Sequence, residues 1–421
     1  MSTSKIHDVA IIGAGLAGLT LALALDQQGI SVTVYESRPA PLNIGGAVML
    51  SPNALKVLDA LGFYETVKPQ GYSFETLEYR DVEGNLVETY EFGNEEKYGY
   101  QGLRIYRHVL IDALVAALAG KGVRVRYGVK FSHVVEDTAA SGVTFSFVDG
   151  TTTTTASASL LIGADGIHST VRKYLYPDLQ PKFVGMAGIT AAVPTAQLKL
   201  PPGYHLPVTI VSPQGAFVIA PQQPDGSEVL IGKQQRVAAG DRTAAGWDRD
   251  FVADKQSGAE FLQQGNDAFP EVVRNATSVV DPQKVNKWPF FVVPKLDRWA
   301  SESRRVLILG DAAHAIPPSA GQGINQAFED AYILALLLGK GGHAGDMTDA
   351  LSFWQSYRQE RVDRILELNQ QIDQRRMPKS DAVVGQGSGV EKAEFELGWL
   401  YSPDFKKDVD DWISRQGVEE A

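Results

Sequence analysis

Three glycines near the N-terminus have the spacing of a loop that cradles a dinucleotide. Gly13, Gly15 and Gly18 stand between an apolar β-like run and a helical pattern. Because glycine has no side chain, the backbone amides and the helix N-terminus can approach a pyrophosphate, whose charge the helix dipole stabilises. Glu36 ends the next β-rich run, where a carboxylate can accept hydrogen bonds from both hydroxyls of an adenosine ribose. The pattern predicts a site for FAD or NAD, and the acidic residue disfavours the 2′-phosphate of NADP there.

Two further motifs decide between these dinucleotides. Asp165 and Gly166 follow one apolar run, and Asp311 follows another, Arg304 to Leu309, more than a hundred residues later. A nicotinamide dehydrogenase has no use for both motifs, so the sequence favours FAD. The segment Ser319-Ala320-Gly321-Gln322-Gly323 then leads into an apolar helix that begins at Ile324. Its amides offer donors and the positive end of a helix dipole to an anionic ring system.

In these motifs and their order, the chain resembles the single-component FAD-dependent monooxygenases. This group A class of aromatic hydroxylases includes salicylate-hydroxylase-like enzymes and natural-product oxygenases, and the resemblance covers about residues 6 to 370. It implies bound FAD, NADPH or NADH as transient reductant, and a flavin C4a-hydroperoxide that delivers one oxygen atom of dioxygen to a small aromatic molecule. In this class the protein supplies position and electrostatics while the cofactor does the chemistry.

The resemblance also implies roles for individual residues. The ADP half of FAD is assigned to the glycine motif and Glu36, and the phosphates to the arginine that opens the helix after Tyr106. Asp165 is assigned to FAD and the nicotinamide nucleotide, Asp311 to the ribityl or phosphate region, and Pro318 with the glycine segment to the isoalloxazine ring. The predicted cofactor-binding residues are Gly13, Gly15, Gly18, Glu36, Arg38, Gly46, Ala47, Arg107, Asp165, Asp311, Gly321, Gly323, Ile324 and Asn325. No catalytic side chain is assigned.

Some positions have two interpretations. Arg38 can pair with a phosphate or with solvent, and Gly45-Gly46-Ala47 can pass the flavin or form an ordinary loop. His314 can shuttle protons beside Asp311, but we favour a histidine held by a backbone hydrogen bond. The aromatic residues of 183–235 are expected in the core rather than in a substrate wall.

One departure from the family concerns the substrate. Several relatives have an arginine that binds an acidic or phenolate substrate in the strand matching Gly188 to Val193, and this strand has none. A carboxylate such as salicylate is therefore not expected. A larger, electron-rich aromatic, indole or polyketide-type substrate of secondary metabolism is favoured instead.

Other enzyme classes remain as alternatives. A flavin-dependent reductase or dehydrogenase of the same fold would perform no oxygen transfer, and a flavin sensor would perform no reaction at all. The Trp-x-Trp-x-Ile-Pro pattern typical of flavin-dependent halogenases is missing.

Composition narrows the function further. The chain has 421 residues, no cysteine, seven histidines and a net charge of −11. Without cysteine there is no disulfide, thiolate metal site or dithiol chemistry, and no histidine pair has metal-binding spacing. The negative charge makes nucleic acid an unexpected partner. With no signal-like or membrane-spanning segment, we expect a cytoplasmic protein.

The elements that position the motifs read as an α/β fold. We expect a glutathione-reductase-type Rossmann FAD domain, an inserted β-sheet substrate domain and C-terminal helices. The predicted FAD domain comprises residues 1–71, 100–179 and 289–376, the substrate domain residues 72–99 and 180–288, and the tail residues 377–421.

Overall fold

A parallel sheet of five strands carries the N-terminal glycine motif. The computed structural model describes residues 6–43, 45–237, 247–340, 347–376 and 395–419. All pairings in this sheet are parallel, and its strands are near-continuous apolar runs, as expected where helices cover both faces. Their order is β18 (Val306–Ile308), β12 (Leu160–Gly163), β1 (Asp8–Ile12), β2 (Ser31–Tyr35) and β8 (Arg124–Arg126).

The parallel order brings the three motifs to one edge of the sheet. Strands β1, β12 and β18 are neighbours, and the glycine motif, Asp165 and Asp311 each follow the carboxyl end of one of them. Ligands of open α/β sheets bind at this edge. The predicted α/β class with a Rossmann-type sheet is therefore confirmed.

A larger, mostly antiparallel sheet of seven strands lies beside the first. Only its β14–β5 pairing is parallel. Its order is β17 (Val285–Val292), β13 (Lys182–Pro194), β16 (Glu228–Arg236), β15 (Gly215–Pro221), β14 (Val208–Ser212), β5 (Thr76–Arg80) and β6 (Leu86–Glu91). The boundary expected after residue 288 falls within β17. We call this sheet, which comes mostly from the segments assigned to the substrate domain, the substrate sheet.

Two small sheets complete the β structure of the described ranges. One contains β11 (Thr152–Ala158), β10 (Gly142–Asp149) and β9 (Val129–Thr138). The other has the order β3 (Ala47–Leu50), β7 (Gly102–Tyr106) and β4 (Tyr72–Phe74). Strand β7 is the centre of this second sheet and leads directly into the helix that Arg107 opens.

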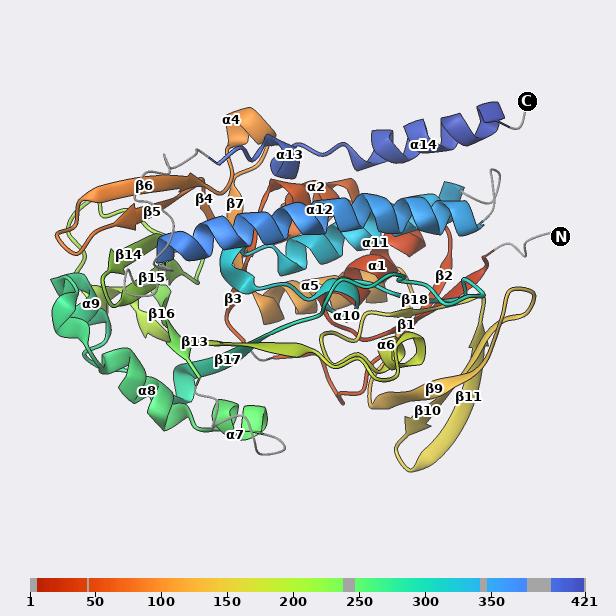
Figure 1. The fold of residues 1–421 in the computed structure, drawn as a ribbon, viewed down its shortest axis with the longest axis horizontal. Helices are drawn as coiled ribbons and strands as arrows, with labels where there is room; N and C mark the ends of the chain where they lie inside the picture. The colour runs from red at the N-terminus through yellow and green to blue at the C-terminus, as the bar shows by residue number, and fades with distance from the viewer. Residues whose placement is uncertain (1–5, 44, 238–246, 341–346, 377–394, 420–421) are drawn as a thin grey trace, which may run out of the picture.

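Helices cover the sheets on several sides. Figure 1 shows α7, α8 and α9 gathered beside the substrate sheet, and the long α12 running across the molecule next to α11. The helices are α1 (Leu16–Gln27), α2 (Pro52–Ala60), α3 (Tyr64–Val67), α4 (Glu95–Tyr98), α5 (Arg107–Gly120), α6 (Thr170–Leu175), α7 (Trp247–Ala253), α8 (Lys255–Gln263), α9 (Glu271–Ala276), α10 (Asp311–His314), α11 (Gly323–Lys340), α12 (Met347–Arg376), α13 (Gly398–Tyr401) and α14 (Phe405–Glu419). None of the helices in these ranges is both long and apolar enough to cross a membrane.

Three apolar clusters hold the elements together. The first packs the parallel sheet against α1, α5 and α11, and the second packs one face of the substrate sheet against α8 and α9. The third joins β5 and β6 to α12 and to Leu397, Leu400 and Tyr401 of the C-terminal segment. Of the predicted tail, residues 377–394 lie outside the described ranges.

Candidate active site

The three N-terminal glycines have different structural tasks. Gly13 has φ +107°, and a Cβ there would lie 2.5 Å from the Ala164 carbonyl oxygen. A Cβ on Gly18 would lie 2.0 Å from the Gly13 oxygen, so both positions need glycine for packing. Gly15 is different, because nothing lies within 4 Å of its Cβ position, and it immediately precedes α1. The open side of the turn therefore lies at the helix N-terminus, an arrangement that suits a pyrophosphate.

Glu36 is oriented toward this turn. Its side chain is almost fully buried, and Oε2 accepts a hydrogen bond from the Ala14 amide at 2.9 Å. The other oxygen accepts from the Arg38 amide at 2.8 Å and from the Ser37 hydroxyl at 3.1 Å. A carboxylate has about four acceptor positions, so Oε2 can still accept a ribose hydroxyl. The Arg38 guanidinium is half exposed and lies 3.4 Å from Glu36, in an ion pair that neither sequence interpretation included.

Asp165 accepts hydrogen bonds from the first turn of the short helix α6, whose N-cap is Ser169. Its Oδ2 accepts from the amides of Thr170 at 2.7 Å and Val171 at 3.2 Å. The second oxygen, Oδ1, is buried without a hydrogen-bond partner, and burial raises the pKa of the carboxyl. Since buried polar atoms are normally satisfied, this oxygen is suited to a ligand hydroxyl or amide.

Arg172 joins the second motif to the third. Its guanidinium, which is 1% exposed, donates to the Ala312 carbonyl at 2.9 Å and also to the Ile167 carbonyl. These two carbonyls lie in the segments that carry Asp165 and Asp311. The guanidinium thus holds the two segments at a fixed separation.

Asp311 and Arg107 face each other across the same region. The Asp311 side chain is accessible, although protein atoms surround it on most sides. Burial raises the pKa of Asp311, and the nearby Arg107 guanidinium opposes this shift. Burial likewise lowers the pKa of Arg107, and a Cβ on Gly45 would lie 4.0 Å from Arg107 Nε. Three separate predicted segments therefore meet here.

The glycine segment reaches the same place. A Cβ on Gly323, the first residue of α11, would lie 4.0 Å from the Asp311 carboxylate. Asn325 is fully buried and ties the segment to β3, because its Nδ2 donates to the Met49 carbonyl at 3.0 Å and its Oδ1 accepts from the Ser51 amide at 2.9 Å. Gly321 has φ +65°, which favours glycine. Ile324, also predicted to bind, follows Gly323 in the first turn of α11.

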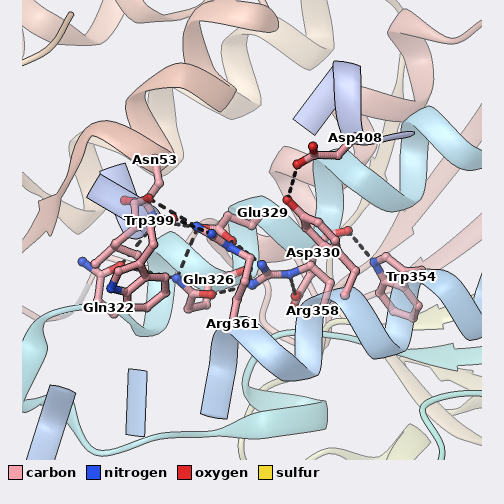
Figure 2. Close-up of polar contacts among 12 residues, drawn as sticks. Asn53, Gln322, Gln326, Glu329, Asp330, Trp354, Arg358, Arg361, Trp399 and Asp408 are labelled. Atoms are coloured by element: carbon pink, nitrogen blue, oxygen red, sulfur yellow. Dashed lines mark hydrogen bonds and ion pairs between the residues drawn. The ribbon is translucent and has the colours of Figure 1, made fainter. Parts of the chain in front are cut away.

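A buried charged network supports these segments, and sequence analysis missed it. Figure 2 shows Glu329 and Asp330 of α11 facing Arg358 and Arg361 of α12. Asp330 accepts from Arg358 Nε at 2.7 Å, and Glu329 accepts from Arg361 Nε at 2.6 Å. Burial alone would raise the pKa of both carboxyls, but their charged partners hold both pKa values below the usual range, that of Asp330 at about 2. The acidic pair within the apolar helix that follows the glycine segment was the available signal.

Asp330 also corrects the interpretation of His314. The imidazole Nε2 lies 2.6 Å from Asp330 Oδ2, and the same oxygen accepts from the Gly310 amide at 2.9 Å. The histidine is buried and structural, but its partner is this carboxylate and not the backbone. Asp330 therefore holds both ends of the turn that presents Asp311.

A cavity of about 700 Å³ lies over the other face of the substrate sheet. Its lining includes Gly188, Gly232, Trp288 and Phe290 from the sheet, and Pro318 and Ser319 from the segment before the glycines. The aromatic lining, which also includes Phe261 and Phe269, comes from residues 261–290. This range lies beyond the 183–235 region considered from the sequence, where Phe217 is core as expected.

These observations fit FAD. The glycine turn approaches a helix N-terminus, Glu36 lies beside it, and Asp165 has a sealed, unsatisfied oxygen. The model of the FAD binding domain matches residues 7–371. The chain belongs to this family. The predicted family, bound FAD and oxidoreductase class are thereby confirmed.

Relatives within the FAD-binding family are similar over most of their length. Hispidin-3-hydroxylase of Neonothopanus nambi is 30% identical over 381 residues, which cover 84% of this chain and 86% of the relative. A 3-amino-4-hydroxybenzoate 2-monooxygenase of Streptomyces platensis is 29% identical and covers 87% of each chain. The crystal structure of Klebsiella pneumoniae HpxO with FAD and uric acid aligns with a TM-score of 0.72 at 25% identity, covering 87% of this chain and 88% of that one.

Proposed function

We propose that the protein is an FAD-dependent monooxygenase that uses NAD(P)H and dioxygen to insert one oxygen atom into an electron-rich aromatic, indole or polyketide-type molecule. The observation that carries the proposal is the cavity on the substrate sheet, whose wall includes Pro318 and Ser319 directly before the glycine segment. A substrate in this cavity would lie beside the predicted position of the flavin ring. Hydroxylase and monooxygenase relatives support the same reaction.

The residues that would hold FAD divide by chemistry. The glycine motif and the start of α1 suit the pyrophosphate, Glu36 suits the ribose, and Arg107 suits a phosphate. Asp165 and Asp311 suit hydroxyl groups, because a carboxylate accepts hydrogen bonds and would repel an anionic ring. When bound, FAD supplies the transfer of electrons from NAD(P)H to dioxygen.

The cavity would bind the substrate. Its aromatic side chains, among them Phe290 and Trp288, offer a flat apolar surface for an aromatic ring. Because Gly188 and Gly232 have no side chains, they leave space above the sheet. A Cβ on Gly232 would lie 2.9 Å from the Thr190 methyl group. The lining also contains polar side chains, among them Lys233 and Gln234. The apolar part of the wall would exclude water from the aromatic ring, which protects a reactive oxygen species from side reactions.

Isotopic oxygen tests the proposed reaction. The purified protein with FAD and NAD(P)H is screened against aromatic scaffolds under ¹⁸O₂, and the product is analysed by mass spectrometry. We expect one labelled oxygen atom in the product. Turnover of substrate without the label would instead identify a reductase or dehydrogenase of the same fold.

A further inference from the structure

Arg104 lies on the central strand of the small β3–β7–β4 sheet, in register with Met49 on one side and Tyr72 on the other. Its neighbours along β7, Leu103 and Ile105, point into the core around the parallel sheet. Since successive side chains of a strand point to opposite faces, Arg104 points away from that core.

The opposite face of β7 is turned toward the substrate sheet. Two residues before Arg104, a Cβ on Gly102 would lie 2.8 Å from the ring of Phe92. Two residues after it, Tyr106 donates to Glu228 and accepts from Gln222 Nε2 at 2.9 Å, and both partners belong to the substrate sheet or its edge.

The glycine segment predicted to pass the flavin ring lies next to the same face of β7. A Cβ on Gly321 would lie 3.9 Å from Cβ of Met49, the direct cross-strand partner of Arg104. Arg104 therefore stands between the substrate sheet and the segment predicted to pass the flavin ring.

The Arg104 guanidinium forms no hydrogen bond or ion pair within the described ranges of the chain. It is 5% exposed, and its Nε is sealed from solvent without a hydrogen bond. Across the residues that the structure describes, no hydrogen bond, ion pair or ring contact of this side chain is formed. Burial lowers its pKa to about 10, so the group remains charged at neutral pH.

Two other buried arginines have partners, although Arg172 Nε also lacks a hydrogen bond. Arg358 contacts both Glu329 and Asp330, and Arg172 donates to backbone carbonyls. A buried charge without a partner costs several kcal/mol, and the cost is recovered when an anion binds with good geometry. Arg104 lies outside the lining of the cavity, next to the glycine segment that follows Pro318 and Ser319 of the cavity wall. An anionic group bound there would belong to a ligand that extends from the cavity toward this segment, because arginine recognises carboxylates with paired hydrogen bonds.

We propose that Arg104 binds a carboxylate or phenolate oxygen of the aromatic substrate. Arg104 would thus replace the substrate-binding arginine that several relatives have in the strand matching Gly188 to Val193. With this replacement, aromatic acids are again expected among the substrates. The proposal rests on the proposed function for the nature of the ligand. The reduced flavin is also an anion that Arg104 could bind. The experiment distinguishes binding of the substrate anion from binding of the reduced flavin.

The first measurement uses the flavin-free protein. We compare the melting temperatures of Arg104→Met, of Arg104→Lys and of the control Arg124→Met, whose side chain is exposed on β8. Because Arg104→Met removes an uncompensated buried charge, its melting temperature should rise, while the control should not change. A fall in Arg104→Met would show that the guanidinium has a structural partner and would overturn the proposal. This result is independent of the oxygenase reaction.

The second measurement concerns the ligand. The dissociation constants of 2-, 3- and 4-hydroxybenzoate and of the matching hydroxybenzamides are measured with the FAD-loaded protein from flavin absorbance. The native protein should bind at least one acid about tenfold more tightly than its amide, Arg104→Met should lose this preference, and Arg104→Lys should keep part of it. An absent preference, or one that persists in Arg104→Met, contradicts the substrate assignment.

The reduction potential of the bound flavin tests whether the anion is the reduced flavin. If the anion were the reduced flavin, Arg104→Met would lower the two-electron midpoint potential by about 30 mV for each tenfold loss of stabilisation. Such a fall without an acid preference would overturn the assignment to the substrate. An unchanged potential together with the lost acid preference supports it.

Discussion

The guanidinium of Arg172 donates a hydrogen bond to the Ala312 carbonyl at 2.9 Å, across 140 positions of sequence. With the Ile167 carbonyl as its second acceptor, it spans the two aspartate motifs that follow β12 and β18. Besides the pairing of β12 with β18, one buried side chain therefore connects the segments that carry Asp165 and Asp311.

Replacing Arg172 should damage both stability and cofactor binding. Arg172→Met leaves two carbonyls without their charged donor, and hydrogen bonds to charged groups contribute about 1.5–3 kcal/mol each. We expect a loss of at least about 2 kcal/mol in urea unfolding and weaker FAD binding. Lys173→Met, exposed on the same helix, is the control. An Arg172→Met protein with native stability would refute the bridging role.

Asp330 should make stability depend on acidic pH. Its folded pKa is about 2, below the usual 3.8, so its stabilising effect is complete above about pH 4 and is lost as the pH falls toward 2. A shift of this size corresponds to roughly 2–3 kcal/mol. In Asp330→Asn, the free energy of unfolding should fall less steeply between pH 4 and pH 2 than in the native protein. Asp349→Asn, exposed on α12, should keep the native slope.

Gln222 should hold the Gly45-Gly46-Ala47 segment in place. Its Oε1 accepts from the Ala47 amide at 3.0 Å, its Nε2 donates to Tyr106, and its side chain is 2% exposed. In Gln222→Leu, hydrogen exchange of the Ala47 amide should accelerate about tenfold, as expected from the loss of about 1.4 kcal/mol of protection. Gln223→Leu removes a neighbouring glutamine whose side chain forms no hydrogen bond with the described residues. Equal exchange in the two variants would exclude this role.

Gly188 should control access to the cavity. A Cβ there would lie 3.3 Å from the Phe290 ring, so Gly188→Val intrudes on the cavity floor. We expect substrate affinity to drop about tenfold or more, as one to two methyl groups of misfit cost 1–3 kcal/mol, with FAD affinity unchanged. Ala192→Val, on the same face but outside the cavity lining, serves for comparison. Unaltered substrate binding in Gly188→Val would locate the substrate elsewhere.

Local patterns carried most of the fold prediction. Helix α5 begins at Arg107 as expected, and α11 begins at Gly323, one residue before the expected Ile324, because the start of an apolar helical run after a turn is a local signal. The cofactor motifs were visible for the same reason, since each combines a strand, a turn and a helix within one short segment.

Contacts between distant segments could not be read in this way. The hydrogen bond of Arg172 to Ala312, the ion pair of Glu329 with Arg361 and the isolation of Arg104 depend on which elements meet in space. A single sequence shows that these side chains are charged but not whether their charges are paired. The aromatic cavity lining was missed because it lies on β17 and near α8, outside the region expected to form it.

Equilibrium titration of the flavin-free protein with FAD tests most directly that the separated segments form one cofactor site. We expect one FAD per chain, and an affinity reduced at least about a hundredfold in Glu36→Arg and clearly reduced in Asp311→Ala, because charged hydrogen-bond partners contribute several kcal/mol. Lys173→Met should bind FAD like the native protein. A native protein that binds no FAD, or Glu36→Arg and Asp311→Ala proteins that bind it with native affinity, would contradict the account.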